Sequence, residues 1–109
     1  MRTDYIGLAY RARKVTIGTE NTIKFLRAGK MKCIILALDA SELTKKKVYD
    51  KAKTYHSPVI EMITSDMLSH ALGKKDIKVI GITDSGFAHL LMNQEGSDLN
   101  AQKTNTTKT

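Results

Sequence analysis

The sequence predicts an α/β fold, a three-layer α-β-α sandwich with a mixed sheet of about four strands. Short apolar runs with strand-like composition alternate along the chain with longer segments that have helical periodicity, which is typical of this layered arrangement. A chain of 109 residues fits one domain that folds without disulfides or metals. Its 41% hydrophobic and 27% charged residues are ordinary for a globular protein, which argues against a coiled coil, a collagen or a wholly disordered chain.

The first two elements are expected to be a helix and a short strand. An apolar stripe at helical spacing predicts the helix, and Thr3 or Asp4 is its expected cap. The residues of this stripe are Tyr5, Leu8, Ala9 and Ala12. A β-branched strand over 15–17 then ends at Gly18.

The middle of the chain predicts two helices around a buried strand. A second helix over 19–28 is expected to stop at Gly29. The continuous apolar run over 33–38 predicts a strand that is buried on both faces. Ser41 is a good cap for a third helix over 42–56, which places Tyr55 on its buried side.

The second half of the chain repeats the alternation. The expected elements are a strand over 59–63, a short helix from Ser65 to Gly73, a strand over 77–82 that contains Gly81, and a last helix that Asp84 or Ser85 caps. Met67 and Leu90 are expected on the buried sides of the two helices. The polar composition after the last helix predicts one domain over 1–94 and a disordered polar tail over 95–109.

Cysteine content and charge narrow the class of protein. The lone Cys33 excludes a disulfide within the chain and any multi-cysteine metal site. No apolar stretch approaches the ~20 residues of a membrane span, and we expect a cytoplasmic protein. The net charge is +7 and unevenly spread. Residues 11–32 hold seven Lys or Arg against one acid, which favours a polyanionic partner.

Few residues suggest catalysis. Asp39 and Asp84 each follow an apolar strand and could hold a magnesium ion, but each also precedes a helix that it could cap. The three histidines have no metal-like spacing. We therefore expect no catalytic residue, no metal and no cofactor. A small metal-dependent enzyme that uses Asp39 and Asp84 stays as one alternative.

The segment from Gly18 to Lys24 is the most informative. It opens a helix directly after a glycine, where free backbone N–H groups suit a phosphate. Glu20, Asn21 and Lys24 are expected on the face opposite the apolar stripe, where an amide and an ammonium could contact base edges. The alternative is an ordinary polar helix start, in which Glu20 pairs with Lys24.

These motifs, in their order and spacing, resemble the kink-turn-binding ribosomal protein family L-seven-Ae / L-thirty-e, most closely its small bacterial members. The resemblance covers about residues 4–92. The segments that carry it are 7–14, 18–24, 29–32, 37–41, 58–59, 68–73 and 82–88. It implies an α-β-α sandwich that binds a sharply bent RNA helix–internal-loop–helix.

The resemblance also implies a site. In the family a helix-opening Gly-x-Asn-Glu-x-x-Lys reads tandem sheared G·A pairs. Gly18 and Lys24 match it, whereas Glu20 and Asn21 carry its two middle groups in exchanged order. The family's second contact is a loop that cradles a flipped-out base, here over 72–77. The implied contacts there are Leu72, Lys74, Lys75 and Ile77, with Asp39 as a neighbouring acid.

We therefore expect a non-catalytic RNA-binding protein that recognises a structured, kink-turn-like RNA. The expected RNA-binding residues are Gly18, Thr19, Glu20, Asn21, Lys24, Arg27, Lys30, Lys32, Asp39, Leu72, Lys74, Lys75 and Ile77, with Arg13 and Lys14 as further phosphate contacts. Ribosomal RNA is the expected partner, with the ribosome or ribosomal proteins as further partners, no membrane and a monomeric state. The remaining alternative is a protein-interaction or substrate-binding module of the same fold.

Overall fold

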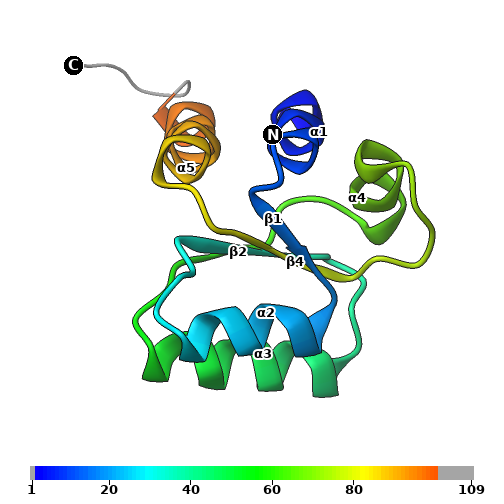
Figure 1. Ribbon diagram of the computed structural model, residues 1–109. Coiled ribbons are helices and arrows are strands. Elements are labelled where there is room, and N and C mark those ends of the chain that lie inside the picture. Colours follow the sequence, from blue (N-terminus) through cyan, green and yellow to red (C-terminus); the bar gives the residue numbers. More distant parts are fainter. Residues whose placement is uncertain (1, 101–109) are drawn as a thin grey trace.

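The computed structural model of the protein describes residues 2–100, which form five helices and four strands (Figure 1). In chain order they are α1 (Thr3–Arg11), β1 (Val15–Ile17), α2 (Thr19–Arg27), β2 (Cys33–Leu36), α3 (Glu42–Thr54), β3 (Val59–Ile60), α4 (Ser65–Leu72), β4 (Val79–Ile82) and α5 (Ser85–Asn100). Within these residues no helix is both long and apolar enough to cross a membrane.

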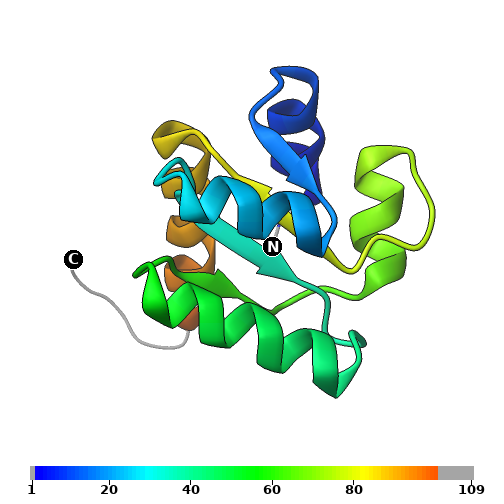
Figure 2. The same cartoon turned by 60° about the horizontal axis from the view of Figure 1, so that its bottom comes forward.

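The strands form one mixed sheet in the order β1-β4-β2-β3. β4 runs antiparallel to both β1 and β2, whereas β2 and β3 are parallel. Helices α2 and α3 cover one face of the sheet, and α1, α4 and α5 cover the other (Figures 1 and 2). The predicted three-layer sandwich with a mixed four-stranded sheet is confirmed.

The core fills the space on both sides of the sheet. Every residue of β2 and β4 is buried, because these central strands have a helical layer on each face. Cys33 and Ile35 join the cluster on the side of α1, α4 and α5, and Ile34 and Leu36 join the cluster beside α2 and α3. Burial of one such Ile or Leu side chain contributes about 1.5–3 kcal/mol relative to exposure.

The antiparallel pairing brings different loops together at the two ends of the sheet. At one end the Gly18 N–H donates to the Val79 carbonyl at 2.9 Å, and the Ala37 N–H donates to the Lys78 carbonyl at 2.8 Å. We call this the Gly18 end. At the other, the Lys14 end, the Thr83 N–H donates to the Lys14 carbonyl at 2.9 Å and the Lys32 N–H to the Ile82 carbonyl at 2.8 Å.

The first helix is rotated from its predicted orientation. Its N-cap is Arg2, without a side-chain cap, so neither Thr3 nor Asp4 caps it. Ile6, Gly7 and Ala9 are buried, while Leu8 is 43% exposed. Ala12, also predicted to be inward, is exposed. The reason is a close helix contact: a Cβ on Gly7 would lie 3.1 Å from the Ala71 carbonyl oxygen of α4.

Several predicted boundaries are confirmed. The Ser41 hydroxyl caps α3 by accepting from the Thr44 N–H at 3.1 Å, Gly73 ends α4 in the left-handed conformation, and Asp84 caps α5. However, Thr64 rather than Ser65 caps α4. Ser65 is instead the first helical residue, where it bonds to Asp39.

Other predicted details are wrong. Tyr55 is exposed because α3 already ends at Thr54, and Met67 and Leu90 lie on outward sides of their helices. The three predicted strands after 29 are shorter than expected. Each keeps only the residues that pair with neighbouring strands, and β3, at the sheet edge, pairs over two positions.

The last helix passes the predicted domain boundary. α5 ends at Asn100, whereas we expected the folded domain to end at 94. Residues 101–109 of the predicted polar tail lie outside the described residues.

Gly81 in β4 gives a test of the packing beneath the sheet. A Cβ there would overlap the end of the Met31 side chain and lie 2.6 Å from Thr16 Oγ1. Thr16 is held in place because its hydroxyl bonds to that of Thr22 at 2.9 Å in the buried interface with α2. We expect Gly81→Ala to lower the free energy of unfolding by about 1–3 kcal/mol in a denaturant titration. An unchanged midpoint would contradict this packing.

Candidate nucleic-acid interface

Gly18 is half-buried and opens α2 with an unusual backbone conformation. Its φ of 90° and ψ of 161° lie in a region that only glycine adopts without strain. A Cβ built there would meet nothing within 4 Å, so the space above this residue is open. No side chain caps the helix, and its first N–H groups are left for solvent or an anion.

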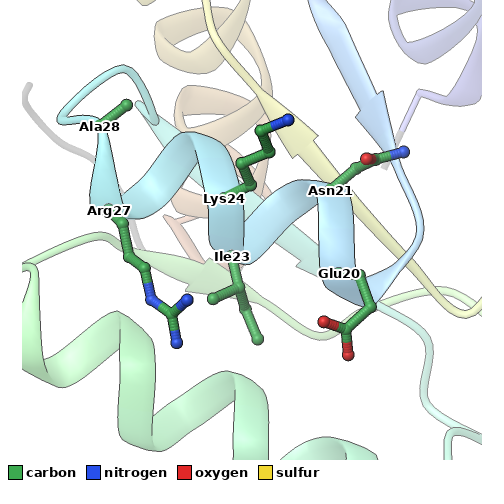
Figure 3. A pocket seen from close by; sticks show the side chains of 6 residues that line it. All are labelled: Glu20, Asn21, Ile23, Lys24, Arg27 and Ala28. Atoms are coloured by element: carbon green, nitrogen blue, oxygen red, sulfur yellow. The ribbon is translucent and has the colours of Figure 1, made fainter.

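Asn21 is oriented by a backbone contact. Its Nδ2 donates to the Ile17 carbonyl at 3.1 Å, across the turn that Gly18 makes. This bond leaves the amide oxygen and one N–H available to a ligand. Lys24 lies one turn further along, and Figure 3 shows that its side chain extends on the same side of α2 as that of Asn21.

Glu20 points the other way. Its carboxylate accepts from Lys47 of α3 at 2.8 Å, so the expected shared face with Asn21 and Lys24 and the alternative pairing with Lys24 are both wrong. The hydrogen bond from Lys47, together with its charge, lowers the pKa of Glu20 below its ordinary value. Figure 3 shows Glu20 and Arg27 on the side of α2 that faces α3. The acid therefore lies away from the amide and ammonium that the motif offers.

An open hollow of about 550 Å³ lies along this part of α2. Its lining residues are Glu20, Asn21, Ile23, Lys24, Arg27 and Ala28 (Figure 3). It combines two cations and an amide with one acid that is already paired to Lys47. This chemistry suits a phosphate or the polar edge of a base.

The α4–β4 loop enters β4 at the Gly18 end, where the Gly18 N–H bonds to the Val79 carbonyl. Lys74 and Lys75 are exposed on it, and the Lys74 ammonium lies 5.6 Å from the centre of the Tyr10 ring. Leu72 is only 5% exposed and belongs to the core, so it cannot pack against a base as the resemblance implied. Ile77 is half-buried, and its N–H is held by Ser69 Oγ at 2.8 Å.

Asp39 joins the loops at this end. One carboxylate oxygen accepts from the Ser65 N–H at 2.6 Å, the other from the Ser65 hydroxyl at 2.5 Å, and Lys78 Nζ lies 3.8 Å away. The bonds from the Ser65 side chain and backbone lower the pKa of Asp39. Both oxygens are thus engaged within the protein, which makes Asp39 a positioning residue for the β2–α3 loop and α4.

This network predicts a pH-dependent stability. Because the folded pKa of Asp39 is below its ordinary 3.8, the stabilisation is complete at neutral pH and is lost as the pH falls below about 4. We expect Asp39→Asn to melt at a lower temperature than the natural chain at pH 7, with the difference shrinking toward pH 3. A difference that stays constant from pH 7 to pH 3 would contradict the carboxylate's role.

The structure brings together part of the predicted site and separates the rest. Gly18, Thr19, Asn21 and the part of the α4–β4 loop that enters β4 are at the Gly18 end, whereas Lys30 and Lys32 are at the Lys14 end with Arg13 and Lys14. Lys74 lies beside Tyr10 of α1. Two cations near the site, Lys47 and Lys78, were not predicted. Lys47 is 27 residues from Glu20, and no local pattern indicates such a contact.

The alternative of a shared metal ion at Asp39 and Asp84 is wrong. The two residues follow antiparallel strands and lie at opposite ends of the sheet. Asp84 Oδ2 accepts from the Phe87 N–H at 2.9 Å, which is its capping role. In the described part of the chain no group of three or more His, Cys, Asp or Glu side chains is placed to hold a metal ion.

Comparison with known proteins agrees with this architecture. The RNA-binding protein YlxQ of Enterococcus faecium is 47% identical over 83 residues, covering 76% of this chain and 80% of its own length. The RNA-binding protein YlxQ of Bacillus subtilis (strain 168) is 40% identical over 87 residues, covering 80% of this chain and 87% of its own length. The expected resemblance to small bacterial members of the family is confirmed.

Solved structures share the fold. A protein of unknown function from Bacillus halodurans has a TM-score of 0.81 and 38% identity, over 84% of this chain and 92% of that one. The 15.5 kD RNA-binding protein of Giardia lamblia has a TM-score of 0.71 at 14% identity, over 87% and 84% of the two chains. Residues 3–92 match the model of one family, and the chain belongs to it: the ribosomal protein L7Ae/L30e/S12e/Gadd45 family.

Proposed function

We propose that the chain is a non-catalytic RNA-binding protein that recognises a structured, kink-turn-like RNA with the Gly18 end of its sheet. The observation that carries this proposal is the combination of the open space above the half-buried Gly18 with Asn21 and Lys24 on one side of α2. The curated relatives are named RNA-binding proteins, which supports the class of ligand.

Asn21, Lys24 and Gly18 are each proposed to make a different contact with the RNA. The Asn21 amide, held by Ile17, is positioned to exchange hydrogen bonds with a base edge, and the Lys24 ammonium to donate to guanine O6 or N7. A widened groove, as in a bent internal loop, is needed, because the deep groove of regular A-form RNA does not admit side chains. The Gly18 backbone leaves room for the RNA to approach.

The exchanged order of Glu20 and Asn21 is compatible with this function. An acid beside guanine O6 would be repelled, but Glu20 is drawn toward α3 by Lys47. The donor at position 21 then acts without a competing carboxylate. On this basis the chain reads sheared G·A pairs through Asn21 and Lys24, and Glu20 contributes no base contact.

The α4–β4 loop is the proposed second contact. Lys74 and Lys75 supply phosphate contacts, and Ile77 is the residue of the loop with a partly exposed apolar side chain that could meet an unstacked base. Ribosomal RNA is the proposed RNA that contains this bent motif, because the family includes ribosomal proteins.

Mapping the bound surface by NMR tests this proposal. Adding a kink-turn RNA to the labelled chain is expected to shift the backbone amides of 18–24 and 74–78, with smaller changes on the outer side of α3. Shifts confined to the groove between α1 and α4, which Leu8 and His70 help to line, would instead favour a binding surface away from the Gly18 end. A plain RNA duplex of equal length serves as the control.

A further inference from the structure

We infer that the Lys14 end of the sheet is a second RNA-backbone-binding surface, so that the protein holds two RNA segments at once. The surface consists of Arg13, Lys14, Lys30 and Lys32, with Phe25 beside them. The inference rests on the proposed function for the class of ligand. It adds a separate surface with its own partner segment.

The strand pairing brings these cations together. Lys14 immediately precedes β1 and Lys32 immediately precedes β2. Their backbones bond to Thr83, which follows β4, and to Ile82 at the end of β4, the strand between them. Two strand spacings of about 4.8 Å place their Cα atoms about 10 Å apart. Thr16 and Ile34, two residues further on, both face the α2 and α3 layer. Because side chains alternate between the two faces along a strand, the side chains of Lys14 and Lys32 leave the backbone on that same side.

The charge of this surface is not neutralised within the described residues. All four basic side chains are exposed, and no ion pair to any of them is found there. The nearest acid along the strands is Asp84, and one of its oxygens is engaged in capping α5. Four cations without acidic partners form a field that attracts a polyanion.

Arg13 adds an independent observation. Its φ of 62° lies in the left-handed region, where an L side chain is strained and glycine or asparagine is favoured. It closes the turn after α1 with its N–H on the Tyr10 carbonyl at 2.9 Å. This strained turn sets the exposed Arg13 side chain beside Lys14, next to the start of β1.

Phe25 supplies an aromatic ring next to the cations. It is 37% exposed on α2, and its carbonyl accepts from the Lys30 N–H at 3.0 Å, which links the two residues across the end of the helix. At the end of an RNA helix an exposed aromatic ring can stack with a terminal base, while lysines beside it bind the backbone. This combination favours RNA over an acidic protein surface.

The two surfaces lie at opposite ends of β1 and approach each other on α2, where Lys24 belongs to the first and Phe25 to the second. Four residues of extended chain separate Lys14 from Gly18, which is a span of about 13 Å. One phosphate cannot contact both ends. A protein seated on an internal loop through its Gly18 end therefore still presents the Lys14 end to a neighbouring RNA helix.

A capture experiment tests this inference. Kink-turn RNA is immobilised and loaded with the protein, and a labelled RNA duplex is then added. We expect the natural chain to retain the duplex, and Lys14→Gln/Lys30→Gln/Lys32→Gln to lose that retention while it still binds the immobilised RNA. The matched control is Lys46→Gln/Lys51→Gln/Lys53→Gln on α3, which removes the same charge and keeps the retention.

Salt dependence and a second variant complete the test. With the duplex alone, the triple variant is expected to reduce the slope of log Kd against log salt by about 2–3, which corresponds to three lost phosphate contacts. Arg13→Asn fits the left-handed backbone, so it is expected to weaken duplex binding without lowering the melting temperature.

The outcomes separate the two proposals. Retention and slope equal to those of the natural chain in both variants would overturn the inference, even when the kink-turn RNA binds. If the natural chain shows no preference for the kink-turn but the variants at the Lys14 end weaken duplex binding, the inference stands and the proposed function fails.

Discussion

Replacing Gly18 with asparagine is expected to lower the free energy of unfolding by about 1–3 kcal/mol and to weaken RNA binding as well. The cause of the first effect is the backbone: φ 90° and ψ 161° are strained for any residue with a Cβ. A local backbone rearrangement that relieved the strain would reorient the start of α2 and break the hydrogen bond from the Gly18 N–H to the Val79 carbonyl. Denaturant titration measures the first effect, and RNA titration of the folded variant measures the second.

Gly73 provides the matched control for this substitution. It also has a positive φ, but its φ of 68° and ψ of 32° are in the left-handed helical region that asparagine tolerates. We expect Gly73→Asn to cost less than half as much stability as Gly18→Asn. Equal costs at the two glycines would contradict the special geometry assigned to the start of α2.

Replacing Lys24 with alanine is expected to raise the Kd for a kink-turn RNA by about five- to 150-fold. This range corresponds to about 1–3 kcal/mol for a side chain that reads a base edge. Lys24 is exposed on the side of α2 that Asn21 shares, so its removal should leave the fold unchanged. The measurement is an RNA titration at constant salt, with thermal denaturation as the check on folding.

A lysine on α3 serves as the control for Lys24. Lys46 is 77% exposed and contacts Asp50 at 3.8 Å, a pair of the kind that contributes little to stability. Lys46→Ala removes the same charge and is expected to change the Kd by less than about threefold. If the two variants weaken binding equally, Lys24 acts through net charge and does not read a base.

The fold was predictable because its signals are local. Apolar periodicity, Ser41 and Asp84 as caps, and glycine at a helix end each act within a few residues, so one sequence is enough to place the helices and strands. The rotation of α1 was not predictable in this way. It depends on Gly7 meeting Ala71 of a helix that begins more than 50 residues later.

The candidate site was predictable only in part, for the same reason. The segment from Gly18 to Lys24 is local, and its open backbone agrees with its composition. The direction of Glu20 depends on Lys47, and the burial of Leu72 on its core neighbours, both set by tertiary packing. The separation of Lys30 and Lys32 from Gly18 follows from strand direction, which charge counts along the chain cannot indicate.

The most direct test compares the Kd for a kink-turn RNA with the Kd for the same RNA after its G·A pairs are changed to Watson–Crick pairs, at two salt concentrations. We expect tighter binding to the kink-turn at both concentrations, with the preference lost in Asn21→Ala and in Lys24→Ala. Equal Kd values for the two RNAs, rising together with salt concentration, would contradict base recognition at the Gly18 end and leave only a polyanion-binding protein.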